Sequence, residues 1–228
     1  MSGVFCISDI HSCYTKFKRA MPGGVSKLIL LGDLVNKGRE QIEMFEWIMK
    51  NAYNKKYVFV RGNAEVRLHN ELIRYYMPNK PGMYFDWLGS ADWYARKNIA
   101  NVVIEAIGKK LFKLDDVLDV LRNQYKWYHI EKKWIMAHAS WKLLKPPNQQ
   151  DKVNLCYDSS NLLGKLMKKD SSIEMHKMYR EHKFIFGHTP TYHIKTGGPL
   201  PCILRDRFYY IDAGMFRTAR PTFFMKLL

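Results

Sequence analysis

The sequence has no apolar run long enough to cross a membrane, since no stretch approaches the roughly 18 consecutive apolar residues that a spanning helix needs. No basic segment followed by a long apolar stretch opens the chain, so we expect no targeting peptide. Repeats, low-complexity tracts and linkers are also missing, and the longest irregular region, residues 142–154, resembles a surface loop. These absences predict one compact domain over residues 1–228 with no membrane partner.

Cysteine is scarce, with four residues in 228, and their spacing is not that of a metal finger: Cys6, Cys13, Cys156 and Cys202. Cys6 lies in an apolar segment that reads as a buried strand. Reduced thiols therefore explain the cysteines better than a disulfide framework does, which predicts a cytoplasmic location.

Acidic residues are few relative to basic ones, at 21 against 37, and the net charge is +16. Such a charge attracts anions: a phosphorylated protein or another phosphate ester, a nucleotide, or nucleic acid. The basic residues are scattered, however, and a solvated basic surface explains them equally well. The charge thus gives a class of partner without choosing among its members, and the oligomeric state stays open.

Short apolar strands alternate with amphipathic helices along the first half of the chain. We expect strands over residues 3–9, 27–33 and 55–63, and helices over 39–51, 64–77, 90–98 and 113–123. A hairpin over 126–139, helices over 159–168 and 171–181, and strands over 183–189, 207–214 and 221–227 follow. This order predicts an α/β fold in which two mixed β-sheets pack as a central sandwich flanked by helices.

Metal-competent side chains follow five of the expected strands, at the point where each strand ends: Asp9 with His11, Asp33, Asn63, His138 and His188. Ligands of α/β sheets gather outside the carboxyl ends of the strands, and six oxygen and nitrogen donors there suit two divalent cations. Each residue also has a plainer explanation, because Asp is common in turns and a histidine after an apolar strand is often a core residue. Five strand ends that all deliver a ligand type favour the metal site.

The motifs "SDIHS", "GDLVNKG", "RGNAE", "AHAS" and "GHTP", in this order from Ser8 to Pro190, resemble those of calcineurin-like metallophosphoesterases. They are most similar to the phosphoprotein-phosphatase branch, with signatures GD-x-H-G, GD-x-x-D-R-G, G-N-H-E, a strand-end His and GHT. Phage-type Ser/Thr phosphatases and bacterial diadenosine tetraphosphate hydrolases share this branch. "YYIDAG" (209–214) resembles the closing I-D-T-G strand of the family.

The resemblance implies a ligand set for two metals. Asp9 and His11 would hold the first metal, and Asp33 would bridge both metals. The second metal would be held by Asn63, His138 and His188. The pair would activate a bridging water for attack on phosphorus. Mn²⁺ suits this mixed ligand set, and Fe, Zn and Ni remain open.

Three positions depart from the family pattern. Ala64 stands where the general-acid histidine of G-N-H-E belongs, and Asn36 replaces the aspartate that partners it. Lys37 replaces a phosphate-binding arginine, which keeps the charge but loses the planar fork. We therefore expect Lys37, Asn63 and above all Arg61 to bind the substrate phosphate.

Loss of a general acid typically lowers the rate by roughly 10²–10⁴. One explanation of Ala64 is a deliberate His→Ala substitution that silences the enzyme, which we favour; the other is a protein that uses another acid, with His69 as one candidate, or a substrate that needs none. The predicted function is hydrolysis of phosphomonoesters, first of phosphoserine or phosphothreonine in proteins. The alternatives are a nucleotide or RNA-end phosphoesterase, including action on dinucleoside polyphosphates, and a silent phosphate-binding module.

Overall fold

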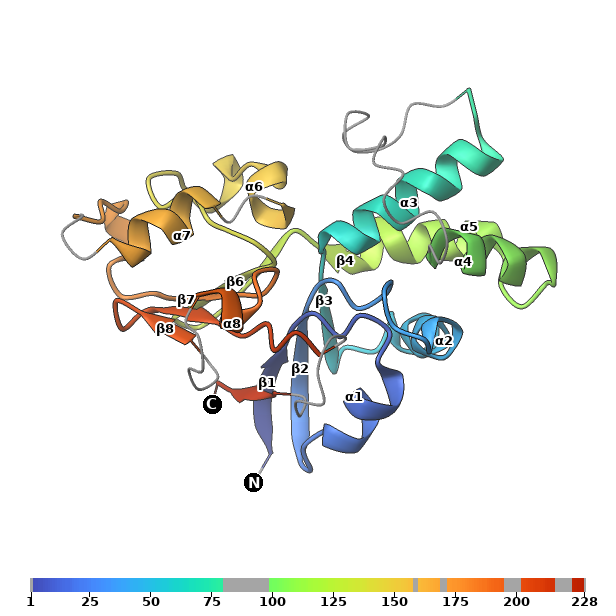
Figure 1. Ribbon diagram of the computed structural model, residues 1–228, viewed down its shortest axis with the longest axis horizontal. Coiled ribbons are helices and arrows are strands. Elements are labelled where there is room, and N and C mark those ends of the chain that lie inside the picture. Colours follow the sequence, from blue (N-terminus) through green and yellow to red (C-terminus); the bar gives the residue numbers. More distant parts are fainter. Residues whose placement is uncertain are drawn as a thin grey trace.

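The computed structural model describes residues 2–79, 99–157, 160–168, 172–194, 202–215 and 223–227. Two five-stranded sheets form its centre (Figure 1). The strands of the first sheet, in spatial order, are β10 (Met225–Lys226), β1 (Gly3–Ile7), β2 (Val25–Leu31), β3 (Tyr57–Val60) and β4 (Tyr125–Lys126). Those of the second are β5 (Tyr128–Glu131), β6 (Trp134–Ala137), β7 (Lys183–Phe186), β9 (Phe208–Tyr210) and β8 (Cys202–Leu204).

Both sheets are mixed: the first has one antiparallel edge strand and the second has two, and the remaining strands are parallel. Strands β1 to β4 are mutually parallel and β10 is antiparallel to β1. In the second sheet β6, β7 and β9 are parallel, while β5 and β8 pair antiparallel at the two edges. The parallel strands of each sheet therefore deliver their carboxyl ends to one common edge.

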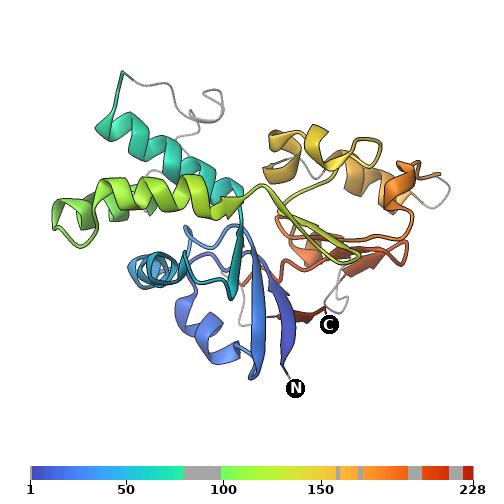
Figure 2. The ribbon, with the colours of Figure 1, turned by 180° about the vertical axis from the view of Figure 1, so that it is seen from behind.

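Helices cover the outer face of each sheet, as the two opposite views show (Figures 1 and 2). Beside the first sheet lie α1 (Tyr14–Ala20), α2 (Gln41–Asn51), α3 (Asn63–Tyr76), α4 (Ile99–Gly108) and α5 (Leu114–Asp119), which continues as a π-helical turn, η3 (Val120–Gln124). Beside the second lie α6 (Lys152–Cys156), α7 (Ser160–Met167) and α8 (Thr191–Ile194), with 3₁₀ turns η4 (Pro147–Gln149) and η5 (Lys177–Tyr179). No helix among these described segments is long and apolar enough to span a membrane.

The period-two alternation of the strands explains how three apolar layers form. On β2, Ile29 and Leu31 face the second sheet, where they meet Met136 and Ile185, whereas Leu28 and Leu30 pack under the helices. The second sheet sends its other face, including Phe184, against α7. The predicted α/β sandwich of two mixed sheets flanked by helices is confirmed.

Some expected elements differ from the observed ones. The helix expected over 171–181 is wrong, since only Lys177–Tyr179 is helical. Ile173 and Met175 instead pack on the second core at alternate positions, and the His176 amide donates to the Leu143 carbonyl. A chain held in this way is extended. The helices α1 and α4 and the short elements α6 and β8 were not predicted, and the helix expected over 90–98 lies outside the described residues.

Candidate metal centre

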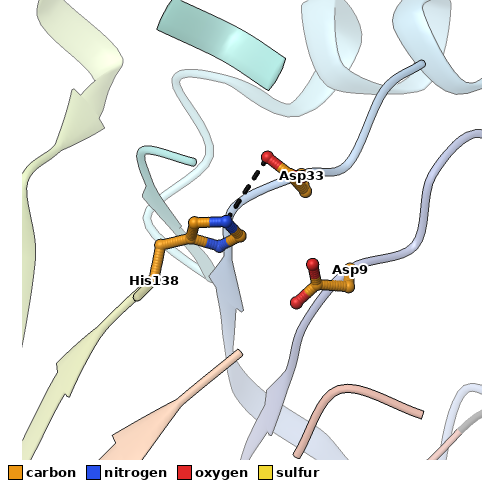
Figure 3. A group of neighbouring side chains, drawn as sticks. All are labelled: Asp9, Asp33 and His138. Atoms are coloured by element: carbon orange, nitrogen blue, oxygen red, sulfur yellow. Dashed lines mark ion pairs between the residues drawn. The ribbon is translucent and has the colours of Figure 1, made fainter. Parts of the chain in front are cut away.

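All six residues expected to bind metal come together where the strands of both sheets end. Asp9 and His11 follow β1, Asp33 follows β2, and Asn63 opens α3 directly after β3. From the second sheet come His138, after β6, and His188, after β7. Figure 3 shows Asp9, Asp33 and His138 facing one another, and one ligand atom from each lies within 4.8 Å of the others.

Four of these six residues have a left-handed backbone: φ is 54° at Asp9, 47° at His11, 50° at Asp33 and 61° at His188. For a residue with a Cβ this conformation costs roughly 1–2 kcal/mol. Backbone hydrogen bonds between neighbouring strand ends hold it, from the Asp9 amide to Gly32 at 3.1 Å and from the His11 amide to Asp33 at 2.9 Å. Strain concentrated in one cluster is typical of functional sites.

Two glycines let the strand ends approach closely enough for the side chains to converge. A Cβ at Gly62 would lie 2.6 Å from Asp33 Oδ1 and collide with the Asp33 amide. At Gly187 a Cβ would collide with Ser8 Oγ and Asp9 Oδ2. Any side chain at either position would push a carboxylate out of the cluster.

One half of the cluster brings together the side chains of His138, His188 and Asn63. His138 Nδ1 lies 2.7 Å from the Leu31 carbonyl, so Nδ1 carries the hydrogen and Nε2 presents a lone pair. The His188 ring donates to the Tyr157 carbonyl, which leaves its Nδ1 with a lone pair. The two ring nitrogens are 3.2 Å apart, and Asn63 Oδ1 lies 3.1 Å from His138 Nε2 and 3.0 Å from His188 Nδ1. In these tautomers the three atoms are all acceptors, a set that a cation between them would satisfy.

The other half of the cluster is built from His11 and the two aspartates. His11 Nδ1 faces the Val35 carbonyl at 3.4 Å, so Nε2 is again the lone-pair nitrogen. It lies 3.8 Å from Asp9 Oδ1 and 3.7 Å from Asp33 Oδ2. The second oxygen of Asp9 accepts hydrogen bonds from the Ser8 hydroxyl and the His188 amide and is thereby fixed.

Asp33 belongs to both halves. Its Oδ2 faces His11 Nε2, while its Oδ1 lies 3.5 Å from His138 Nε2. The Ala64 amide donates to Oδ1 at 2.8 Å and fixes the carboxylate plane. One oxygen is therefore directed to each group of ligands, which is the arrangement that a bridging carboxylate needs.

Burial and charge prepare these groups to receive cations. Burial, helped by the field of Lys37, lowers the pKa of His11 to about 4, and burial with the neighbouring His138 lowers that of His188 to about 4. Both rings are therefore neutral near pH 7 and can offer lone pairs. Burial and the charge of Asp33 raise the pKa of Asp9 well above its usual range. Burial also opposes ionisation of Asp33, but His138, His11 and Lys37 outweigh it and lower its pKa to about 2.

The positions that depart from the family pattern surround this cluster. Ala64 is 2% exposed, and its methyl group packs with the apolar core beneath the helices. Asn36 is partly buried with φ of 74°. Lys37 is exposed, and its Nζ lies 3.0 Å from His11 Nε2, at the entrance to the first group of ligands.

Arg61, the expected phosphate clamp, makes its described side-chain contacts with η3, Tyr125 and Trp127. Its side chain is 1% exposed, and Nη2 donates to the carbonyls of Leu121 at 2.6 Å and of Arg122 and Tyr125 at 3.2 Å. The guanidinium also lies over the Trp127 ring at 4.9 Å. A cation at the last carbonyls of a helix is favoured by the helix dipole, so the described contacts of Arg61 anchor η3 to β3.

Other groups support the site without standing out in the sequence. The Glu65 carboxylate accepts hydrogen bonds from the amides of Gly62, Asp33 and Leu34 and so ties two strand-end loops together. Its position as the acidic residue of the G-N-x-E motif is the sequence feature that could have predicted this role. His69, considered as a substitute acid, is fully buried and its Nε2 accepts from Arg122 Nε at 3.2 Å. It does not face the cluster.

Comparison with known proteins identifies the family of this chain. The sequence model of the calcineurin-like phosphoesterase family matches residues 3–192, and the chain belongs to that family. A symmetrical bis(5'-nucleosyl)-tetraphosphatase of Nitrosospira multiformis is 25% identical over 149 residues, which are 61% of this chain and 46% of the relative. The chain thus spans less than half the length of that relative.

Solved structures share the fold at low sequence identity. A cold-active protein tyrosine phosphatase of a psychrophilic Shewanella superposes with a TM-score of 0.53 at 14% identity, over 98% of this chain and 74% of that one. A protein serine/threonine phosphatase of Saccharomyces cerevisiae gives 0.53 at 10% identity, over 92% and 67%. These likenesses establish the architecture alone.

Proposed function

We propose that the chain is a two-metal phosphoesterase. Asp9, His11 and Asp33 would hold the first cation, and Asp33, Asn63, His138 and His188 the second. The observation that carries this proposal is the position of Asp33, which directs one oxygen to each group of ligands. The histidine nitrogens also fit a cation, since Nε2 of His138 and Nδ1 of His188 lie 3.2 Å apart and both can offer a lone pair to it.

Two bound cations would lower the pKa of a water held between them and polarise the phosphoryl oxygens. The protein's own groups do the rest. Asn63 and the histidines fix the geometry, Glu65 holds the loops that carry Asp33 and Asn63, and Lys37 at the entrance attracts a phosphate oxygen. Manganese is the metal to test first, with Fe, Zn and Ni as alternatives.

Ala64 bears on the choice of substrate. A serine alkoxide is a poor leaving group that needs a proton, and the methyl group of Ala64 supplies none. A phosphate leaving from a phosphoanhydride carries its charge without protonation. The chain is therefore suited to dinucleoside polyphosphates better than to phosphoserine or phosphothreonine, in line with its tetraphosphatase relative. The +16 charge also favours a polyanionic substrate.

The test is a leaving-group series measured with Mn²⁺ and with a chelator. Diadenosine tetraphosphate and p-nitrophenyl phosphate should be hydrolysed, phenyl phosphate more slowly, and a phosphoserine peptide slowest. Chelation should abolish all four activities, and metal analysis should return two ions per chain. Equal rates on the phosphoserine peptide and p-nitrophenyl phosphate would contradict the substrate argument. Metal binding without hydrolysis of any member would favour the silent phosphate-binding module.

A further inference from the structure

Arg67 lies on the second turn of α3, where the helix carries side chains toward the metal centre. It is four residues after Asn63, so the two share a helix face. At about 100° per residue it points between the directions of Asn63 and Ala64, and long helical side chains lean toward the N-terminus. Its neighbours Val66 and Leu68 are buried, whereas Arg67 is partly exposed. A guanidinium placed in this way extends toward the turn that carries Asn63.

Tyr157 ties Arg67 to the ligands of the second cation. The Tyr157 hydroxyl lies 3.5 Å from the main-chain carbonyl of Asn63 and interacts with the Arg67 side chain. The main-chain carbonyl of the same tyrosine accepts the hydrogen bond from His188. Tyr157 thus contacts two expected ligands and Arg67 at once, although it lies 94 residues from Asn63.

The hydrogen bonds leave Arg67 with donors to spare. The Tyr157 hydroxyl donates to the main-chain carbonyl of Asn63, so it meets Arg67 as an acceptor. A guanidinium has five N–H donors. Its Nε is buried, and within the part of the chain that the structure describes it has no hydrogen-bond partner. A fork of donors fixed beside a cation site fits a phosphate group.

We propose that Arg67, held by Tyr157, binds the substrate phosphate beside the second cation position. This inference rests on the proposed function and adds the residue that selects the phosphate. The phosphate-binding role predicted for Arg61 thereby passes to Arg67 on α3, because the guanidinium of Arg61 contacts η3. With Lys37 on the side of His11 and Arg67 on the side of His188, a positive group flanks each half of the cluster.

The experiment titrates inorganic phosphate into Mn²⁺-loaded protein by calorimetry, after metal content has been measured. We expect Arg67→Ala to weaken phosphate binding at least about tenfold and Tyr157→Phe several-fold, because hydrogen bonds to charged groups are among the stronger ones. Arg67→Lys should recover part of the loss. All three variants, Arg67→Ala, Arg67→Lys and Tyr157→Phe, should keep the metal content of the wild type. In p-nitrophenyl phosphate hydrolysis, Tyr157→Phe should raise KM more than it lowers kcat.

The matched control is Arg74→Ala, on the same helix, where the exposed guanidinium pairs with Glu71 at 3.1 Å. It should leave phosphate binding unchanged. Wild-type phosphate affinity in Arg67→Ala with full metal content would overturn this inference and leave the proposed function standing. If Arg67→Ala fails to fold or to bind metal, the other two variants decide. Equal phosphate affinities in Arg67→Lys, Tyr157→Phe and wild type would then overturn the inference about Arg67. A wild type that binds no metal would overturn the proposed function and this inference with it.

Discussion

The candidate metal centre and the residues around it follow different rules. In the centre, all six expected ligands are present, and backbone strain, close glycine contacts and buried hydrogen bonds fix them. In the surroundings, Ala64, Asn36 and Lys37 depart from the family pattern, and Arg61 has a purely structural set of described contacts. Several contacts fix each residue of the centre, whereas the residues around it tolerate substitution.

The difference has a physical origin. A ligand in the centre also takes part in the framework, as Asp33 does by accepting a hydrogen bond from the Ala64 amide, so its loss disturbs neighbouring residues as well. A residue that donates a proton or grips a phosphate acts only on the substrate. Exchange of such a residue changes rate or specificity and leaves the fold intact. Three substitutions separate these two cases.

The largest effect is expected from Asp33→Asn. It removes the charge that both groups of ligands share, at a cost of several kcal/mol, or on the order of a thousandfold in rate. Metal analysis and p-nitrophenyl phosphate hydrolysis measure the result. Asp116→Asn, at an exposed position of α5, is the control and should change neither. Two full-affinity metals in Asp33→Asn would exclude the bridging role.

Arg61→Met tests whether that arginine belongs to the centre or to the framework. The change keeps much of the length of the side chain but leaves three carbonyls without their charged donor. We expect a loss of about 3 kcal/mol in the free energy of unfolding. Urea unfolding measures it, with Arg74→Met as an exposed control that should change stability by less than about 0.5 kcal/mol. A raised KM with unchanged stability would restore the phosphate-clamp interpretation.

Ala64→His is expected to change the fold least of the three substitutions but to change the rate markedly. A proton donor at this position should raise kcat for phenyl phosphate roughly a hundredfold and that for p-nitrophenyl phosphate less. Adding Asn36→Asp shows whether the new histidine needs its acidic partner. A lower Tm without any gain in rate would show instead that the buried Ala64 methyl is needed for packing.

The strand ends could be predicted because each motif is local. Asp9, Asp33 and His188 directly follow apolar strands in the sequence, and parallel strands of one fold must end on the same side. The contacts of Arg61 could not be predicted. Its side chain packs against η3, which lies about 60 residues further along the chain, and no local sequence pattern indicates that contact. The helix expected over 171–181 failed for a similar reason, since packing of Ile173 and Met175 on the second core replaced helical hydrogen bonds.

The sequence by itself determined the α/β sandwich, the six residues at its strand ends and the family, because alternation, turns and short motifs act over a few residues. Only the tertiary structure decided which lone pairs face one another, that Asp33 directs one oxygen to each group, and that Tyr157 joins Arg67 to Asn63. Those relations depend on contacts between segments up to 179 residues apart, such as the His188 amide and Asp9. Such contacts form only when both sheets are packed.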